Sequence, residues 1–176
     1  AILLCRITDR SVRPLFPKGY RNDVQIVLTA LSADPEHYLD VLSILGTSAA
    51  LTISNVPWNG PIGAVRVGYV DGKYIFNPTA PEMENSTLDL RMAGSQEAII
   101  MVEAGAKEAP EEVVLEGLAQ GHQAIQDMIR VQLQMREQLG KEKMAFTVQE
   151  PNQELIDQVK AAAGEPVAKV LLETDD

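Results

Sequence analysis

Residues 63–76, with the sequence Gly-Ala-Val-Arg-Val-Gly-Tyr-Val-Asp-Gly-Lys-Tyr-Ile-Phe, decide the fold of this 176-residue chain. Apolar side chains alternate on both sides of the Asp71-Gly72 pair, at Val65, Val67, Tyr69, Tyr74 and Phe76. An Asp-Gly pair between two alternating runs is typical of a type I′ turn, because both central residues of that turn need a positive φ angle. The stretch therefore predicts a β-hairpin within an antiparallel sheet.

Downstream, the sequence predicts a second hairpin and a long helix. Strands are expected at 88–92 and 99–102, where apolar residues again gather on either side of a polar turn. A helix is expected from Pro110 to about Leu139, because proline suits the first helical turn and Gly140 suits the residue after the last. The apolar stripe of this helix is expected to consist of Val114, Leu118, Ile125, Met128 and Ile129.

Upstream, three further elements are expected. Residues 2–13 have the pattern of a helix that Pro14 ends. Residues 24–33 have apolar side chains at both alternating positions, which predicts a strand covered on both faces. A helix from about His37 to Ile53 follows, with an expected buried side formed by Leu39, Leu42, Leu45, Gly46, Ala49 and Ile53.

The order of these elements is helix, strand, helix, four strands, long helix and a helical stub. It predicts an α+β layered domain in which a mixed or antiparallel sheet packs against helices. Residues 141–151 have the composition of a linker, and a polar helix is expected to begin near Asn152. That last piece is too short to fold alone.

Charge is unevenly distributed along the chain. The whole sequence has a formal net charge of −10, which disfavours general binding to nucleic acid. The segment before residue 22 is basic, and Arg6, Arg10 and Arg13 would share one helical face that suits a phosphate chain. Two alternatives stay open, a solvated helix face and an ion pair between Asp9 and Arg13 at i,i+4.

Other features exclude several classes of protein. Cys5 is the only cysteine, so no intrachain disulfide can form, as is usual in a reducing cytosol. The two histidines and the cysteine do not have the spacing of a zinc site. No apolar run approaches the ~20 residues that a membrane-spanning helix needs. Because the chain begins without Met inside a helical pattern, we expect it to be a piece of a longer protein.

Three passages resemble the first RNase PH-type domain of bacterial polynucleotide phosphorylases. They are RITDRSVRPLFPKGYRNDVQI (6–26), GTSAALTISNVPWNGPIGAVRVGYVDGKYIFNPT (46–79) and STLDLRMAGSQEAIIMVEAGAKE (86–108). The resemblance extends over about 6–139 in family order. It implies an RNase PH-like fold, with residues 1–147 as the C-terminal portion of that domain and residues 148–176 as the start of an all-helical linker domain.

The resemblance also implies a function. Polynucleotide phosphorylases are homotrimers that degrade RNA from the 3′ end with inorganic phosphate and Mg²⁺, release nucleoside diphosphates and can polymerise them in reverse. By this resemblance the parent protein is a cytoplasmic nucleotidyltransferase that acts in mRNA degradation and can associate with other RNA-degradation proteins. The alternative for this chain is a non-catalytic module that guides RNA and supports the trimer. No membrane partner is implied.

In this family, the second RNase PH-type domain supplies the reactive groups. These are serines that bind phosphate at the start of the core helix, and two aspartates and a lysine on the strands that follow. Here, by resemblance, residues 38–40 (Tyr-Leu-Asp) stand at the serine positions, Asp89 stands at one aspartate position and Arg91 at the lysine position. The other aspartate position falls near Met83, which cannot bind a hard cation. The resemblance therefore implies a vestigial site without catalytic residues or a bound metal.

Each of these residues also has a structural interpretation. Asp89 and Arg91, two apart on a strand, would point to the same face, where a simple cross-strand charge pair is the common explanation. His37 and His122 are expected to be structural or exposed to solvent. Trp58 is expected to pack in its proline-rich turn, with stacking on a base as the alternative. Arg6, Arg10 and Arg13 are expected to face an RNA path or a subunit interface.

Overall fold

The computed structural model describes residues 2–148 and 152–173. The chain divides into two compact units. The first contains the described residues up to 17 and from 22 to 145, and the second contains 18–21 and the described residues from 146 onward. The predicted boundary between the two domains at 147/148 stays a prediction.

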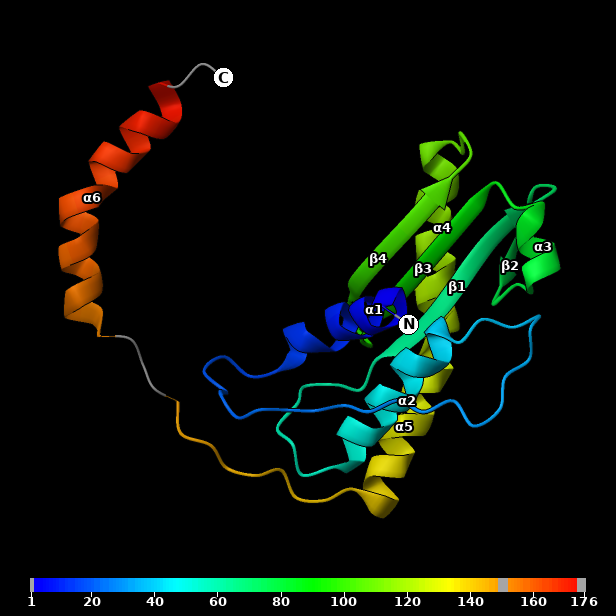
Figure 1. Cartoon of the computed structure of the whole chain (residues 1–176), viewed down its shortest axis with the longest axis horizontal. Coiled ribbons are helices and arrows are strands. Elements are labelled where there is room, and N and C mark those ends of the chain that lie inside the picture. Colours follow the sequence, from blue (N-terminus) through cyan, green and yellow to red (C-terminus); the bar gives the residue numbers. More distant parts are fainter. Residues whose placement is uncertain (1, 149–151, 174–176) are drawn as a thin grey trace. The chain divides into compact units, whose positions relative to one another are not determined.

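The first unit is built on a four-stranded antiparallel sheet with the order β2-β1-β3-β4 (Figure 1). Its strands are β1 (Gly63–Val70), β2 (Lys73–Phe76), β3 (Leu88–Gly94) and β4 (Ile99–Ala106). The turn between β1 and β2 has φ angles of 48° at Asp71 and 77° at Gly72, as a type I′ turn requires. Both predicted hairpins are confirmed, and so is the α+β layered fold.

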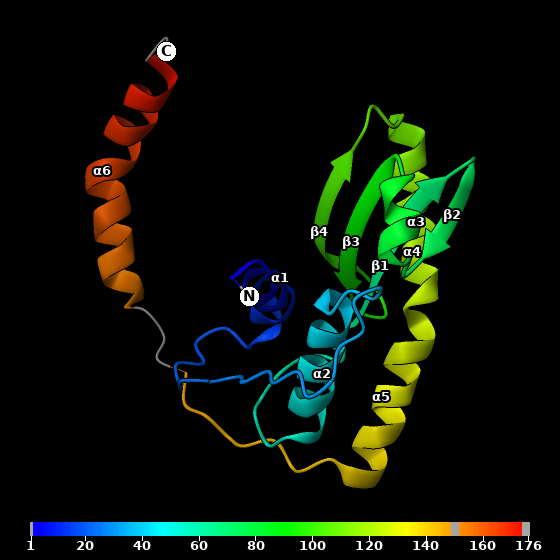
Figure 2. The same cartoon turned by 45° about the vertical axis from the view of Figure 1, so that its right-hand side comes forward.

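Side chains alternate between the two faces of the sheet along each strand, and each face packs against different helices. One face packs against α4 (Glu111–Ala124) and α5 (Gln126–Leu139), through a buried cluster of Val65, Val67, Leu88, Leu90, Met92, Ile125 and Ile129. The opposite face carries small residues such as Ala64 and Ala93, which lie in a second cluster with α1 (Ile2–Val12) and α2 (Asp40–Ile53). Figure 2 shows the sheet between these two helical layers.

The long helix has the predicted extent with one interruption. It is divided at Ile125, which ends α4 and precedes α5, and Pro110 lies just before the first helical residue. The predicted end at Gly140 is confirmed. Ile125 is fully buried between the two halves and keeps its amide bonded to the oxygen of Gly121, so the helical path continues.

The buried side of α2 was predicted wrongly. The helix begins at Asp40 rather than His37, Leu42 is 61% exposed, and the buried positions are Ser43, Ile44, Thr47, Ser48, Leu51 and Thr52. The reason is tertiary hydrogen bonding. The Ser48 hydroxyl donates to Gln132 Oε1 on α5 at 2.6 Å and accepts the Ile62 amide at 2.9 Å, so this polar group is satisfied inside the core. Thr47 Oγ1 and Thr52 Oγ1 are buried on the same face without a hydrogen-bond partner among the described residues.

The predicted strand at 24–33 is also wrong. This segment belongs to no strand, and no backbone hydrogen bond joins it to another part of the described chain. Val24 is half-buried, but Val27 is 75% and Leu31 is 94% exposed. A strand is stabilised by hydrogen bonds to a neighbour, and all four strands of this sheet come from residues 63–106.

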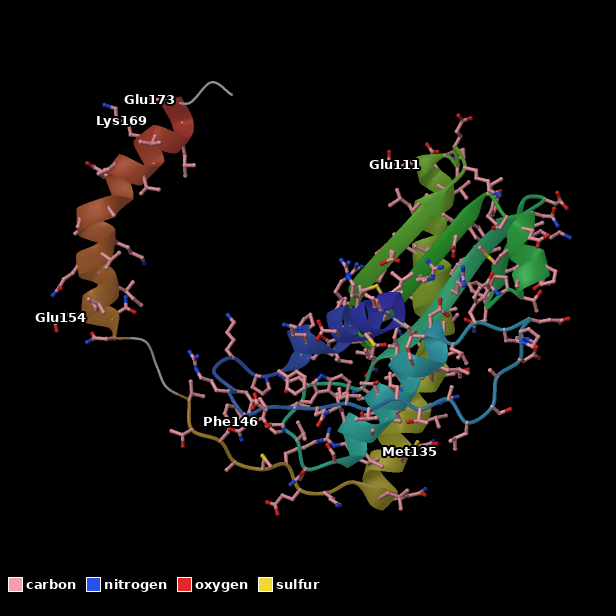
Figure 3. All side chains as sticks on the ribbon, viewed as in Figure 1. Glu111, Met135, Phe146, Glu154, Lys169 and Glu173 are labelled. Carbon is pink, nitrogen blue, oxygen red and sulfur yellow. The ribbon has the colours of Figure 1, made fainter. Side chains whose placement is uncertain are left out.

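The remaining elements are short or separate. The N-terminal helix ends as predicted and continues into a 3₁₀ turn, η1 (Arg13–Leu15), while α3 (Ala80–Glu84) was not predicted. The second unit contains the predicted polar helix, α6 (Gln153–Glu173), whose side chains extend on all sides with none buried (Figure 3). No helix in the described ranges is long and apolar enough to span a bilayer.

Candidate functional site

Charged side chains form a row across the sheet face that lies toward α1 and α2. In the strand register, Arg66 of β1 stands opposite Arg91 of β3, and Arg91 stands opposite Glu103 of β4. Paired residues of neighbouring strands point to the same face. Two arginines directly opposite one another repel, so this arrangement requires carboxylates close to both guanidinium groups.

Asp89 is the first of these carboxylates. In the strand register Asp89 stands opposite Gly68 of β1 and Gly105 of β4, so neither of its directly paired residues has a side chain. It accepts hydrogen bonds from Arg66 Nε at 2.7 Å and Nη2 at 2.8 Å, and from Arg91 Nη2 at 3.0 Å. The interpretation of Asp89 and Arg91 as a structural charge pair is therefore supported, and Arg66 is the principal partner.

Asp40, the first residue of α2, is the second carboxylate. Its Oδ2 accepts a hydrogen bond from Arg91 Nε at 2.9 Å and lies 3.5 Å from Arg66 Nη1. The same two guanidinium groups are thus bridged by two carboxylates, one from the sheet and one from the helix. The Tyr38 ring covers the group from a third side, with Arg66 Cζ 3.6 Å from the ring centre.

Arg66 is the most deeply buried member of this cluster, with 6% of its side chain exposed. Its Nη1 is enclosed and makes no hydrogen bond to any described residue, although the Asp40 carboxylate is near. At the outer end of the row, Glu103 lies 3.2 Å from Arg10 and 3.8 Å from Arg91. Three arginines and three carboxylates make the cluster electrically neutral, as burial of charge requires.

The chemistry available to this cluster is limited. Both oxygens of Asp89 accept hydrogen bonds from arginine, so a divalent cation could bind there only by displacing guanidinium groups. No group of three His, Cys, Asp or Glu side chains in the described part of the chain is arranged to hold a metal ion. The described residues therefore do not fit Mg²⁺.

A hollow of about 520 Å³ opens beside Asp89. Its lining includes Met83 of α3 and Lys107 just after β4. The structure therefore brings Met83, the position where the resemblance places a second aspartate, to the same hollow as Asp89. The Met83 thioether is a soft and weak ligand, so the carboxylate that the resemblance places at this position is replaced, although Glu84 also lines the hollow.

The three arginines of the N-terminal helix have different surroundings. Arg13 donates hydrogen bonds to Asp9 at 2.6 to 3.1 Å, which supports the i,i+4 alternative, and this carboxylate raises the pKa of Arg13. Arg10 donates to Glu103 and to the Val102 oxygen. Arg6 is exposed. A role for the three in RNA binding or at a subunit interface stays a prediction.

The remaining residues of interest are structural. Trp58 is 5% exposed and donates from Nε1 to the Val12 oxygen at 2.9 Å, which confirms packing in the turn. His37 is exposed beside Asp34 at 3.0 Å, and His122 contacts the Ser95 oxygen at 3.0 Å.

The main residue that sequence reasoning missed is Arg66. A charged residue between Val65 and Val67 was the available signal, but its significance depends on the pairing of β1 with β3. The contact of Asp40 with this arginine could not be expected from the sequence either, because it joins α2 to β1.

Two models of known protein families together match most of the first unit. Residues 1–57 match the model described as 3′ exoribonuclease family, domain 1. Residues 60–124 match the model described as 3′ exoribonuclease family, domain 2.

Individual relatives are similar over almost the whole chain. A polyribonucleotide nucleotidyltransferase of Thermomicrobium roseum is 46% identical over 175 residues, which is 99% of this chain and 22% of the relative. Proteins of the same name from a Roseiflexus species and from Thermus thermophilus are 51% identical over 146 residues and 49% identical over 162 residues. These alignments cover 83% and 92% of this chain, and 20% and 22% of the relatives. The chain spans about a fifth of the length of these curated relatives.

Proposed function

The chain belongs to the 3′ exoribonuclease family, and we propose that it is part of a phosphate-dependent enzyme that degrades RNA from the 3′ end. The parent enzyme releases nucleoside diphosphates and can polymerise them in reverse, with inorganic phosphate as co-substrate and Mg²⁺ as cofactor. Support comes from relatives named polyribonucleotide nucleotidyltransferase that are 46–51% identical to this chain. Since the chain covers only a fifth of them, the activity belongs to the longer protein.

Within that enzyme, we assign this chain a non-catalytic role. The observation that carries the assignment is the neutral cluster around Arg66, in which Asp40 and Asp89 are both engaged by arginine. Phosphorolysis needs donors that hold the incoming phosphate and carboxylates that hold a metal on the transferring group. Here the carboxylates neutralise the donors, so neither part is available. The reaction then takes place in another domain of the parent.

Assays of the full-length parent protein test the proposed phosphate-dependent activity. It should release nucleoside diphosphates from oligoadenylate when both phosphate and Mg²⁺ are present, and release should stop when phosphate is omitted. Hydrolysis to nucleoside monophosphates without phosphate would contradict phosphate dependence. Absence of any RNA degradation under both conditions would contradict the enzyme assignment itself.

A second candidate role is the guidance of RNA by the N-terminal helix. It is favoured by the exposure of Arg6 and by the partial exposure of the ion pairs of Arg10 and Arg13, whose side chains are 44% and 74% exposed. Ion pairs at this exposure contribute little, so a phosphate chain can replace the carboxylate partners. RNA is the partner of this role, and the parent is proposed to be a cytoplasmic homotrimer that can contact other RNA-degradation proteins.

A triple Arg→Ala variant at these positions of the parent tests RNA guidance. Each lost phosphate contact should flatten the dependence of log K on log salt concentration by about 0.7 for single-stranded RNA. The matched control replaces Arg130, Arg136 and Lys141 by Ala, which removes the same charge from another region. Equal salt dependence in the two triple variants would exclude a guiding role for the N-terminal helix.

A further inference from the structure

We infer that Asp40 is an internal counter-ion that closes an anion site, and that removal of its carboxylate opens this site to a tetrahedral oxyanion such as orthophosphate. The site consists of Arg66, Arg91 and the N-terminus of α2. Asp40 occupies the position where such a ligand would place an oxygen atom.

The first argument is the strand register. Arg66 and Arg91 stand directly opposite one another, and their guanidinium groups are bridged on one side by Asp89 and on the other by Asp40. Asp89 comes from the same sheet, whereas Asp40 is brought by a separate helix. Without Asp40, two buried or half-buried guanidinium groups would share one bridging carboxylate, and the pair would carry an excess positive charge.

The second argument is the state of Arg66. This side chain is 94% buried, and its Nη1 has no hydrogen-bond acceptor among the described residues while Asp40 Oδ2 lies 3.5 Å away. A charged donor in such a position gains strongly from a better-placed anionic acceptor. An oxyanion can offer several oxygens and can accept from Arg66 Nη1 and Arg91 Nε together. Of the two arginines, Asp40 accepts a hydrogen bond only from Arg91, and its Oδ1 accepts the Val41 amide at 2.9 Å.

The third argument is the position of Asp40 at the first residue of α2, a helix of 14 residues. No side chain caps this helix at its N-cap residue, Leu39. The first-turn amides and the helix dipole favour a negative charge there, which at present is the Asp40 carboxylate, whose Oδ1 accepts the Val41 amide. Two arginines and one helix terminus thus converge on one carboxylate group.

Space is available once the carboxylate is removed. Asp40 and Arg66 both line a cavity of about 290 Å³ toward α5 and another of about 220 Å³ toward α1. The second is also lined by Arg91. An Asp40→Ala variant would add the volume of the carboxylate to these cavities, each already larger than the ~30 Å³ that one water molecule occupies. In the unmodified chain, Asp40 and Tyr38 keep the site closed to anions.

Isothermal titration of the 176-residue chain with inorganic phosphate at constant ionic strength tests this inference. Asp40→Ala should bind phosphate at least ~10-fold more tightly than the unmodified chain, a difference of about 1.4 kcal/mol. Adding Arg91→Gln to Asp40→Ala should abolish the gain. The control is Asp23→Ala, which makes the same change of net charge at an exposed position. Sulfate should compete, because it has the same tetrahedral shape.

Thermal unfolding provides the second readout, since Asp40→Ala can be too unstable for titration. In that case phosphate should raise its Tm more than chloride of equal ionic strength, and the near-isosteric Asp40→Asn variant should show the same preference. If neither variant binds phosphate more tightly than Asp23→Ala, and neither is preferentially stabilised by it, the inference is wrong. These tests need no RNA, so they can fail while the proposed function stands.

Discussion

Asp89→Asn distinguishes a structural carboxylate from a metal ligand. In the structure Asp89 accepts three charge-assisted hydrogen bonds from Arg66 and Arg91, and Arg66 is almost fully buried. Asparagine keeps one acceptor oxygen but turns an NH₂ donor toward a guanidinium group. Breaking a buried pair from one side costs up to ~3–5 kcal/mol. Because Asp89 is 30% exposed and Asp40 remains, we expect a loss of about 2–3 kcal/mol.

Urea and thermal unfolding measure this loss. A decrease of that size should lower Tm by roughly 4–12 °C for a domain of this length. Combining Asp89→Asn with Arg66→Met should cost less than the sum of the two single changes, with a coupling energy of at least about 1 kcal/mol. Asp127→Asn is the matched control, since Asp127 pairs with Arg130 at 2.9 Å but is 82% exposed, and its loss should stay within about 0.5 kcal/mol.

Two results would refute this reasoning. The first is an Asp89→Asn variant as stable as the Asp127→Asn control. The second is a stabilisation of the unmodified chain by Mg²⁺ that Asp89→Asn removes, because this would show that Asp89 binds a cation.

Two further predictions concern packing and pH. Gly63→Ala should lower the free energy of unfolding by about 1–3 kcal/mol, because the added Cβ would lie 2.8 Å from the Ile125 oxygen. Gly46→Ala should raise the free energy of unfolding by about 0.5–1 kcal/mol, since nothing lies within 4 Å of the added atom. Urea titration measures both changes, and the opposite order of stabilities would contradict the packing. Lys143→Met should cost about 1–3 kcal/mol, because Lys143 Nζ donates to three carbonyl oxygens at the end of α2 at 2.8 to 3.2 Å. Desolvation and the charge of Arg136 lower the pKa of Lys143 in the folded chain below its usual value, so the unfolded chain holds this proton more tightly. The free energy of unfolding should therefore rise with pH between the folded-state and unfolded-state pKa values of Lys143. The same rise in Lys143→Met would show that Lys143 is not its cause.

Local sequence signals predicted the sheet well. Asp71-Gly72 specified the first hairpin because the turn needs two positive φ angles, and this requirement is met within four residues. Gly140 marked the end of the long helix for a similarly local reason. By contrast, the burial of α2 could not be predicted, because the Ser48 hydroxyl is satisfied by Gln132, a residue 84 positions away. The sequence therefore suggested the wrong buried face.

The candidate site was predictable only in part. The resemblance directed attention to Asp89, Arg91 and residues 38–40, and the structure brings these together. The bridging role of Arg66 depends on the alignment of β1 with β3, which no short motif specifies. The segment 24–33 shows the opposite limitation, since an apolar segment does not make a strand where no strand of the described residues pairs with it.

We propose that this chain lacks phosphorolytic groups because arginine engages both Asp40 and Asp89. The most direct test is to incubate the purified 176-residue chain with oligoadenylate, inorganic phosphate and Mg²⁺, and to separate the products by ion-exchange chromatography. We predict no ADP above the level of a reaction without phosphate. Phosphate-dependent release of ADP that disappears in Asp89→Asn would contradict the account.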